Sequence, residues 1–281
     1  MRIAVTGAAG GLGVSLMALL SGRENTEALP ITRKEADLAD TAAVKEAIRR
    51  LKPGVVVHCA ALTAVDRCES AKDLAWQINV EGTRAVADAA RGVGARLVYV
   101  STDYVFDGAK NGPYAPDDAP HPLNVYGVTK REGEKIALDT PGGLVVRSSW
   151  LFSRGGKSFV RTVLDLAAKQ PEIKMVNDQV GAPTYSKDLA AAILLCIEKN
   201  AAGILHVANA GACTWYEYAK KILALKGVSG VAVAPITSDE LGRPARRPKN
   251  SRLDCSAYAA LAGRPLRPWD EALEEMLETL R

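Results

Sequence analysis

A chain of 281 residues is long enough to bury a large core, either as one α/β unit or as two closely joined lobes. Its 36 basic and 32 acidic residues give a net charge of only +4 without a continuous basic stripe, which argues against nucleic-acid and membrane partners. The five cysteines show no Cys-x-x-Cys spacing and the three histidines are scattered, which predicts reduced thiols and no metal site. The sequence also contains no signal-like N-terminal core and no apolar run of about 18 residues. We therefore predict a cytoplasmic protein without a membrane span.

The first half of the chain alternates apolar, β-branched runs with amphipathic segments. Strands are predicted at 3–5, 28–31, 55–58, 97–100 and 144–147, and helices at 14–20, 42–51, 74–91 and 126–138. Strands that are apolar throughout and separated by helices indicate a parallel sheet covered on both faces. The prediction is an α/β fold with a Rossmann-type, doubly wound parallel sheet.

The alternation stops after Arg147. Loop is predicted at 150–156, helix at 159–169, strand at 174–176 and helix at 187–198, and the remainder, rich in Pro and Arg, predicts a smaller α+β lobe. We assign residues 1–147 to a dinucleotide-binding domain, completed by about 173–198. Residues 148–281 are assigned mainly to a substrate-binding lobe, with a cleft between the two.

A glycine-rich turn follows the first strand and opens the first helix. Gly7 permits the tight turn, Gly10 lets backbone amides approach a pyrophosphate, and Gly13 packs the helix against the strand. Glycines also end strands for steric reasons alone, but the strand-turn-helix context favours a dinucleotide site. The predicted contacts with the cofactor include Gly11 and Leu12 of the same turn.

The second strand is followed by Thr32-Arg33-Lys34, without an acidic residue that could bind a ribose 2′-hydroxyl. Arg33 and Lys34 are candidates for binding a 2′-phosphate, which favours NADPH over NADH; the alternative is a solvated basic loop. The adenosine side of the cofactor is expected to contact Asp37, Leu38, Ala60, Ala61 and Leu62.

Two short blocks further along indicate hydride chemistry on a carbonyl. Tyr126 and Lys130 are four residues apart on a predicted helix, so the ammonium can lie beneath the phenol and lower its pKa toward neutrality. Tyr126 is then a proton donor, and Thr102 at the end of the fourth strand supplies a second hydroxyl. Tyr-x-x-x-Lys alone also arises as an exposed helix pair, so the prediction depends on the combination.

These motifs resemble the extended short-chain dehydrogenase/reductases, and within them the dTDP-4-dehydrorhamnose reductases. The resemblance extends over nearly the whole chain. It rests on the blocks at 63–69, 101–108, 122–127, 133–134, 147–150, 178–184, 214–218, 247–251 and 268–269.

The resemblance implies reduction of the C4 keto group of dTDP-6-deoxy-L-lyxo-4-hexulose to dTDP-L-rhamnose by NAD(P)H. Tyr126 would protonate the developing alkoxide, Lys130 would hold the nicotinamide ribose, and Thr102 would bind the carbonyl oxygen. The hydride would come from the cofactor itself. Asn79 would anchor a proton-relay water beside the cofactor.

Asp103 and Trp150 would contact the sugar; for Trp150, as for Trp215, packing between the lobes is the alternative. The segment 243–250 concentrates arginines, and Arg247 is the residue we expect to bind the substrate diphosphate, with a solvated basic loop as the alternative.

Some bacterial members of the family carry a glutamate two residues beyond the last glycine of the turn, where it helps to bind magnesium across a dimer interface. The corresponding residue here is Ser15, so we predict no metal, and either a monomer or a homodimer.

Two other functions remain open. A regulatory subunit of this family binds NADP without catalysis, but it would not need Thr102, Tyr126 and Lys130 together. A nucleotide-sugar epimerase, or a reductase acting on another sugar, would use the same three residues. Release of oxidised cofactor at each turnover separates a reductase from an epimerase.

Overall fold

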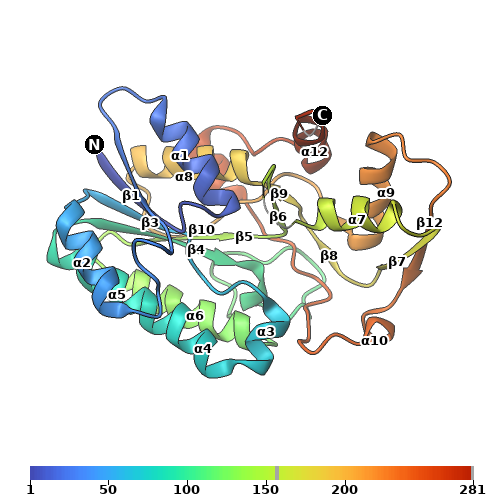
Figure 1. The fold of residues 1–281 in the computed structure, drawn as a ribbon, viewed down its shortest axis with the longest axis horizontal. Coiled ribbons are helices and arrows are strands. Elements are labelled where there is room, and N and C mark those ends of the chain that lie inside the picture. The colour runs from blue at the N-terminus through green and yellow to red at the C-terminus, as the bar shows by residue number, and fades with distance from the viewer. Residues whose placement is uncertain (156–157, 280–281) are drawn as a thin grey trace.

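The computed structural model describes residues 1–155 and 158–279. Its centre is a parallel sheet with the strand order β10-β5-β4-β3-β1-β2 (Figure 1). The strands are β1 (Arg2–Thr6), β2 (Glu27–Ile31), β3 (Val55–His58), β4 (Arg96–Thr102), β5 (Leu144–Ser148) and β10 (Gly203–His206). The order reverses between β1 and β3, and open α/β sheets bind ligands beside the carboxyl ends of the strands at such a point.

Helices cover both faces of this sheet, as predicted. One face carries α1 (Gly11–Ser21), α8 (Ser186–Glu198) and α11 (Ser256–Ala262), and the other carries α2 (Thr41–Leu51), α5 (Gly82–Gly92) and α6 (Val125–Leu138). Alternate strand residues divide between the two cores: Ile3 packs with α1 and α8, whereas Ala4 packs with α2 and α5. Both sides of each strand are therefore apolar, which explains the continuous apolar runs.

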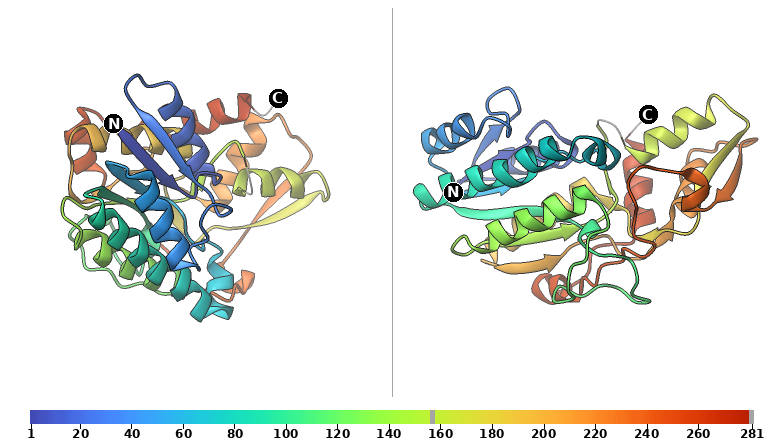
Figure 2. Two further views of the ribbon diagram at one scale, coloured as in Figure 1. Left: turned by 60° about the vertical axis from the view of Figure 1, so that its left-hand side comes forward. Right: turned by 90° about the horizontal axis from the view of Figure 1, so that it is seen from below.

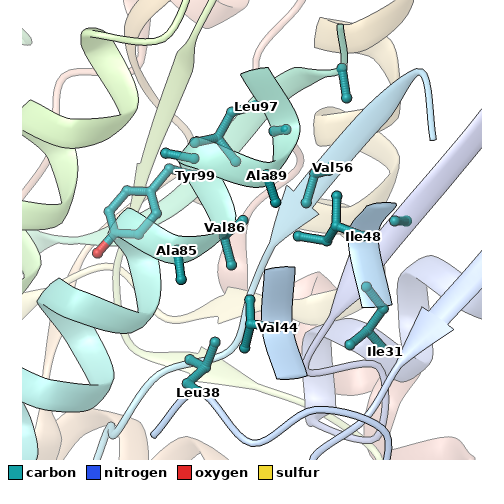
Figure 3. Packing of buried hydrophobic residues seen from close by; sticks show 14 of the residues in the cluster. Ile31, Leu38, Val44, Ile48, Val56, Ala85, Val86, Ala89, Leu97 and Tyr99 are labelled. Carbon is teal, nitrogen blue, oxygen red and sulfur yellow. The ribbon is translucent and has the colours of Figure 1, made fainter. Parts of the chain in front are cut away.

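The core on the second face is built from small and branched side chains. Val44 and Ile48 of α2 lie beside Val86 of α5 above the strand residues Val56 and Leu97 (Figure 3). Alanines on α5 let it approach both α2 and the sheet closely, because a short side chain leaves little between the backbones.

Short elements connect β3 to α6. They are α3 (Val65–Ser70), α4 (Lys72–Trp76), a π-helical turn η1 (Gln77–Glu81) that leads into α5, and a 3₁₀ turn η2 (Asp103–Val105) after β4. The single helix predicted at 74–91 is thus divided among α4, η1 and α5. π-helical turns occur frequently at functional sites, and η1 contains Asn79.

The smaller lobe lies to one side of the sheet (Figure 2). Its helices are α7 (Phe159–Ala167), α9 (Trp215–Leu225), α10 (Ser238–Leu241) and α12 (Trp269–Glu278). Its strands pair two by two within the described residues: β6 (Leu151–Phe152) with β9 (Thr184–Tyr185), β7 (Glu172–Val176) with β12 (Ala232–Ile236), and β8 (Val180–Gly181) with β11 (Cys213–Thr214). Tyr218, Ile222, Leu273 and Met276 belong to its core.

The boundary between the dinucleotide-binding domain and the smaller lobe differs from the predicted one. Residues 173–198 do not act as a unit, because β7 pairs with β12 in the smaller lobe whereas α8 packs against the face of the sheet that holds α1. The sequence analysis also missed β10, which adds a strand beside β5, and α11. The predicted loop 150–156 contains β6, and its last residue lies outside the described residues.

A buried ion pair fixes α6 to the sheet. The guanidinium of Arg147 on β5 donates from Nε to Oε1 of Glu134 at 2.7 Å and from Nη2 to Oε2 at 2.9 Å, and both side chains are almost fully buried. Ser101 of β4 donates to the same carboxylate at 2.6 Å. Nη1 of Arg147 reaches the carbonyl of Pro116 and the ring of His206 on β10. The pair therefore joins α6 to three neighbouring strands and to the loop between β4 and α6.

We expect Glu134→Gln to lower the free energy of unfolding by about 3–5 kcal/mol at pH 7, because it leaves the Arg147 guanidinium buried without a counterion. Urea denaturation measures the loss. Glu132→Gln is the matched control, since Glu132 pairs with Lys135 on the exposed side of α6 and should cost less than about 1 kcal/mol. Equal losses in the two variants would contradict the anchoring role.

The difference in unfolding free energy between the wild-type protein and Glu134→Gln depends on pH. Burial raises the pKa of the Glu134 carboxyl, but the hydrogen bonds and charge of Arg147 outweigh burial, so the folded-state pKa lies below the ordinary value. The stabilisation is thus complete above the unfolded-state pKa of about 4.3 and is lost as pH falls through the folded-state value. The stability difference between the wild-type protein and Glu134→Gln should therefore shrink on acidification.

Candidate active site

A cavity of about 1210 Å³ lies at the carboxyl ends of the central strands and extends to the smaller lobe. It brings together most of the residues predicted from the sequence. These are Gly7, Gly10, Gly11, Leu12, Gly13, Arg33, Asp37, Leu38, Ala60, Ala61, Leu62, Thr102, Asp103, Tyr126, Lys130 and Trp150. Lys34, Asn79 and Arg247 are not part of its lining.

The glycine-rich turn forms one end of the cavity. Gly7 has a φ of +68°, and a Cβ there would lie 2.9 Å from the backbone nitrogen of Ala60. A Cβ on Gly13 would lie 2.2 Å from the carbonyl oxygen of Gly7. Gly10 is the N-cap of α1, and the first turn of this helix contains no acidic residue. The backbone N–H groups of that turn can therefore donate hydrogen bonds to an anion. The turn has the shape and the donors that the diphosphate of a dinucleotide requires.

Only one of the two predicted basic residues borders the cavity. Arg33 lines it, with 81% of its side chain exposed, and its Nε donates to Oδ2 of Asp37 at 2.8 Å. A hydrogen bond from the Ala39 backbone, together with Arg33, lowers the pKa of the Asp37 carboxyl. Arg33 is thus placed at the mouth of the cavity by an ion pair that a ligand phosphate would have to rearrange.

The predicted proton donor lies at the start of α6. The side chain of Asn124 caps this helix by accepting from the Gly127 N–H at 2.8 Å. A Cβ on Gly127 would lie 2.2 Å from the carbonyl oxygen of Tyr104, so only glycine lets the helix approach η2 this closely. Tyr126 and Thr102 thereby line the same cavity.

Lys130 is not directed as predicted. Its Nζ donates to the carbonyl of Val100 at 2.7 Å and lies 3.9 Å from the centre of the Tyr99 ring. Burial lowers the pKa of Lys130 to about 7. Burial also raises the pKa of Tyr126 above its ordinary value, and the neighbouring Thr102 side chain offsets this only in part. Because desolvation dominates both groups in this structure, the lowering of the phenol pKa by Lys130 stays a prediction.

Two buried polar atoms in the wall of the cavity lack partners. Within the described residues, Oδ2 of Asp103 and Oγ of Ser148 accept or donate no hydrogen bond although both are buried. Both residues line the cavity, and Ser148 is paired with Thr102 in the sheet register. Buried polar atoms are nearly always hydrogen-bonded, so these two indicate where a polar ligand binds. Sequence reasoning missed Ser148, although it follows Arg147 in a block that carried the family resemblance.

The two tryptophans both pack against each other and line the cavity. Trp150 and Trp215 are stacked with ring centroids 3.6 Å apart and planes 7° apart. Trp150 has a φ of +46°, a backbone conformation that costs a non-glycine residue on the order of 1–3 kcal/mol and is typical of functional sites. A Cβ on Gly181 would lie 2.5 Å from the Trp150 indole, so the ring is held from both sides. Packing and sugar contact are therefore not exclusive alternatives.

Asn79 does not face the cavity. Its Oδ1 accepts from the Leu62 N–H at 2.7 Å, and its Nδ2 donates to the Leu62 carbonyl at 3.2 Å and to Oγ1 of Thr129 at 3.0 Å. Both amide hydrogens are thus used, but an amide oxygen can accept a second hydrogen bond, so the role as a water anchor stays a prediction. Asn79 fixes the backbone of Leu62, which does line the cavity.

Arg247 forms an ion pair with Asp66 and, like Asn79, does not line the cavity. Its two terminal nitrogens donate to the two carboxylate oxygens of Asp66 on α3, both at 2.9 Å, and Nη1 also donates to the carbonyl of Ala245 at 2.7 Å. These three hydrogen bonds use three of the five guanidinium N–H groups, so the contact with the substrate diphosphate stays a prediction that competes with the ion pair. The ion pair joins the smaller lobe to α3.

The position that carries glutamate in some relatives has a local partner. Oγ of Ser15 on α1 lies 2.8 Å from Oγ of Ser186 on α8. In the part of the chain that the structure describes, no three or more His, Cys, Asp and Glu side chains are grouped so as to hold a metal ion. No helix among these residues combines the length and apolar character needed to cross a membrane.

The comparisons with known proteins agree with this geometry. The family model described as RmlD substrate binding domain matches residues 1–281. The dTDP-4-dehydrorhamnose reductase of Streptomyces griseus is 42% identical over 288 residues, which cover 99% of this chain and 94% of that protein. A crystal structure of a dTDP-4-dehydrorhamnose reductase from Clostridium acetobutylicum ATCC 824 has a TM-score of 0.95 at 40% identity and covers 100% of this chain and 99% of its own. The dTDP-4-dehydrorhamnose reductase of Bacillus anthracis str. Ames in complex with NADP has a TM-score of 0.94 at 38% identity and covers 99% of both chains.

A double-mutant cycle tests the function of Arg247. If its role is the ion pair, Arg247→Ala and Asp66→Ala should each lower the free energy of unfolding by about 1–2 kcal/mol, and the double variant by little more than either. The dissociation constant for dTDP, measured by titration calorimetry, should change equally in the two single variants. A tenfold loss of dTDP affinity in Arg247→Ala alone would restore the diphosphate contact expected from the sequence.

Proposed function

The chain belongs to the RmlD substrate-binding domain family, and on that premise we propose that it reduces the C4 keto group of dTDP-6-deoxy-L-lyxo-4-hexulose to dTDP-L-rhamnose. The observation that carries this proposal is one cavity whose lining contains both a glycine turn suited to a diphosphate and the hydroxyl-bearing side chains of Thr102 and Tyr126. The protein is an NAD(P)-dependent oxidoreductase; a relative in this family was crystallised with NADP.

Each step of such a reduction has a residue in the cavity that can perform it. The bound nicotinamide supplies the hydride. Tyr126 donates a proton to the carbonyl oxygen, and because burial keeps its pKa above the ordinary value, the phenol is protonated at physiological pH. An alkoxide is far more basic than a phenolate, so this raised pKa does not prevent proton transfer.

Lys130 has the donors to hold the ribose of the cofactor. An ammonium carries three N–H groups, and the carbonyl of Val100 uses one. Two remain for ribose hydroxyls. The Val100 bond fixes the position of Nζ at the carboxyl end of β4, beside Thr102, so a sugar ring bound there would lie between the glycine turn and the proton donor.

Two further properties complete the proposal. We place the reaction in the cytoplasm, since five free cysteines suit a reducing compartment. We propose no metal requirement, because Ser15 bonds to Ser186 where some relatives carry a glutamate.

The reaction is tested with purified protein, NADPH and the dTDP-4-keto-6-deoxy sugar. We expect stoichiometric oxidation of NADPH and a product identified by NMR as dTDP-L-rhamnose. Sugar conversion without net loss of NADPH would indicate an epimerase. NADPH binding without any conversion would indicate a regulatory subunit.

Tyr126→Phe should lower kcat by roughly 10²- to 10⁴-fold, because it removes the hydroxyl that protonates the product while keeping the ring. The dissociation constant for NADPH, followed by fluorescence, should stay within about threefold. Tyr104→Phe is the matched control, because the centre of its ring lies 6.0 Å from that of Tyr126 in an edge-on arrangement and the substitution likewise removes only a hydroxyl. A comparable loss of kcat in both variants would remove Tyr126 from the chemistry.

Arg33→Ala should reduce the preference for NADPH over NADH by about five- to tenfold, because it removes a cation from the mouth of the cavity and leaves the Asp37 carboxylate facing a 2′-phosphate. Lys34→Ala should have little effect, since Lys34 does not line the cavity. The measurement is kcat/KM for each cofactor. An unchanged ratio in Arg33→Ala would make this segment a solvated loop.

A further inference from the structure

We propose that Gln179 and Gly181 are positioning residues that hold Trp150 and Trp215, the tryptophan pair, as one rigid surface for the hexose of the sugar nucleotide. The inference rests on the proposed function and adds the residues that set how firmly the sugar is held. Neither Gln179 nor Gly181 is part of the cavity lining, whereas both tryptophans are. Gln179 and Gly181 therefore act on the sugar through the two indole rings.

The tryptophan pair lies where the hexose has to bind. Ser148 at the end of β5 is opposite Thr102 in the parallel register, so their backbones are about 5 Å apart. Trp150 is two residues further along, a length that extended chain spans in at most about 7 Å. A carbonyl bound beside Thr102 and Tyr126 therefore brings its sugar ring close to Trp150. The thymine is further away, because the diphosphate and the deoxyribose separate it from the hexose.

Indole rings suit the apolar side of this sugar. A 6-deoxyhexose carries a methyl group and ring C–H groups, which aromatic side chains bury favourably. Trp150 and Trp215 are only partly buried, so both present surface to the cavity. Their rings are stacked with centroids 3.6 Å apart, which couples the position of each ring to that of the other.

Gln179 fixes the ring of Trp215 through a chain of hydrogen bonds with a defined direction. The indole Nε1–H of Trp215 donates to Oε1 of Gln179 at 3.1 Å, and Nε2 of Gln179 donates to Oγ of Ser238 at 2.8 Å. Oγ of Ser238 donates to Oδ1 of Asp178 at 2.6 Å. An indole nitrogen can only donate, so the amide oxygen must face Trp215 and the amide nitrogen must face Ser238. The chain thus permits a single orientation of the Gln179 amide.

Trp215 is held at its backbone as well as at its ring. Thr214 caps α9 by accepting from the Glu217 N–H at 3.1 Å, which fixes the first residue of the helix, Trp215. Gln179 is 4% exposed, so water does not readily replace the bonds that its amide makes. With both ends held, the ring of Trp215 offers Trp150 a fixed plane.

Gly181 leaves the space that the ring of Trp150 occupies. A Cβ on this residue would lie 2.5 Å from Cε2 and 2.6 Å from Nε1 of the indole. Two hydrogen bonds tie the neighbouring backbones together. The Thr184 N–H donates to the Trp150 carbonyl at 3.3 Å, and Oγ of Ser149 donates to the Ala182 carbonyl at 2.7 Å. Because the backbones are tied, a side chain at 181 has to displace the indole.

Gly181→Ala is the steric test. Gly181 lies in β8 with a φ outside the left-handed region, so alanine fits the backbone and acts only through its Cβ. The dissociation constant for dTDP-L-rhamnose, measured by titration calorimetry with NADP⁺ present, should rise roughly three- to tenfold, because a displaced ring loses about one aromatic contact. The dissociation constant for dTDP should not change, since dTDP lacks the hexose. Gly112→Ala is the matched control, because a Cβ there meets no atom within 4 Å.

Gln179→Met tests the hydrogen-bond chain, because it keeps the length of the side chain and removes both polar atoms. The KM for the keto sugar nucleotide should rise roughly three- to tenfold with kcat unchanged, since a surface that contacts ground and transition states alike contributes only to binding. Trp215→Phe removes the same hydrogen bond, so the double variant should lose little more affinity than either single variant. Thr237→Ala is the control: it removes the cap of α10 and leaves the chain intact.

The indole N–H of Trp215 reports its positioning without any ligand. In protein labelled with ¹⁵N-tryptophan, its NMR signal is assigned by its absence from Trp215→Phe. The N–H should exchange with solvent at least about tenfold more slowly in the wild-type protein than in Gln179→Met, because the bond to a buried acceptor must open first. Protection in the wild-type protein supports the proposal even if Gly181→Ala folds poorly.

The contrary results are distinct. Unchanged affinity for dTDP-L-rhamnose in Gly181→Ala and Gln179→Met would overturn the proposal. An equal loss of affinity for dTDP would place the tryptophan pair at the nucleotide and would overturn it too. So would an equal loss in Gly112→Ala or Thr237→Ala, which would indicate general loosening of the fold. Failure of the wild-type protein to oxidise NADPH with the keto sugar would instead refute the proposed function, which the calorimetry and NMR do not measure.

Discussion

The buried pair of Glu134 and Arg147 is the interaction on which the active-site geometry depends. Transferring two charges out of water costs several kcal/mol each, and here the two-pronged contact, together with donors from Ser101 and Arg131, offsets that cost. Tyr126, Lys130 and Glu134 follow one another at four-residue intervals, so they form one stripe on α6. The polar stripe faces the sheet because its last member is anchored there. The ion pair of Glu134 with Arg147 therefore fixes the position of α6 along its axis and its rotation about that axis, and with them the position of Tyr126.

Desolvation, rather than ion pairing, controls the proton chemistry of the cavity wall. Burial raises the pKa values of Tyr126 and Asp103 and lowers those of Lys130 and His58, the last to about 3. In each case the neutral form is favoured. Around these groups, the direction of each hydrogen bond therefore depends on where single protons reside.

The sequence was sufficient for the first five strands of the central sheet and for the glycine turn, because these follow from apolar periodicity and from glycine spacing. Thr102 and Tyr126, on β4 and α6, line one cavity as their two sequence blocks indicated. The sequence was insufficient wherever the outcome depended on which hydrogen bonds are already made. Arg247 and Asn79 have the right side chains for a diphosphate and a water, but Asp66 and Leu62 use their donors. Nothing local in the sequence indicates these partners, since they lie far away along the chain. The predicted boundary between the two domains differed from the structure for a similar reason: β7 and β10 are short strands of five and four residues, and only pairing decides which sheet each joins.

The path of the chain explains why the unpartnered atoms of the cavity point to a ligand. After β5 the chain enters the smaller lobe, returns for α8 and β10, leaves for β11 and α9, and returns again for α11 before α12. The stack of Trp150 on Trp215 and the pair of Arg247 with Asp66 add contacts along the same junction. Several covalent crossings and packed contacts restrict rotation of one half against the other. We therefore expect Oδ2 of Asp103 and Oγ of Ser148 to gain partners from a molecule that enters the cavity rather than from closure of the lobes.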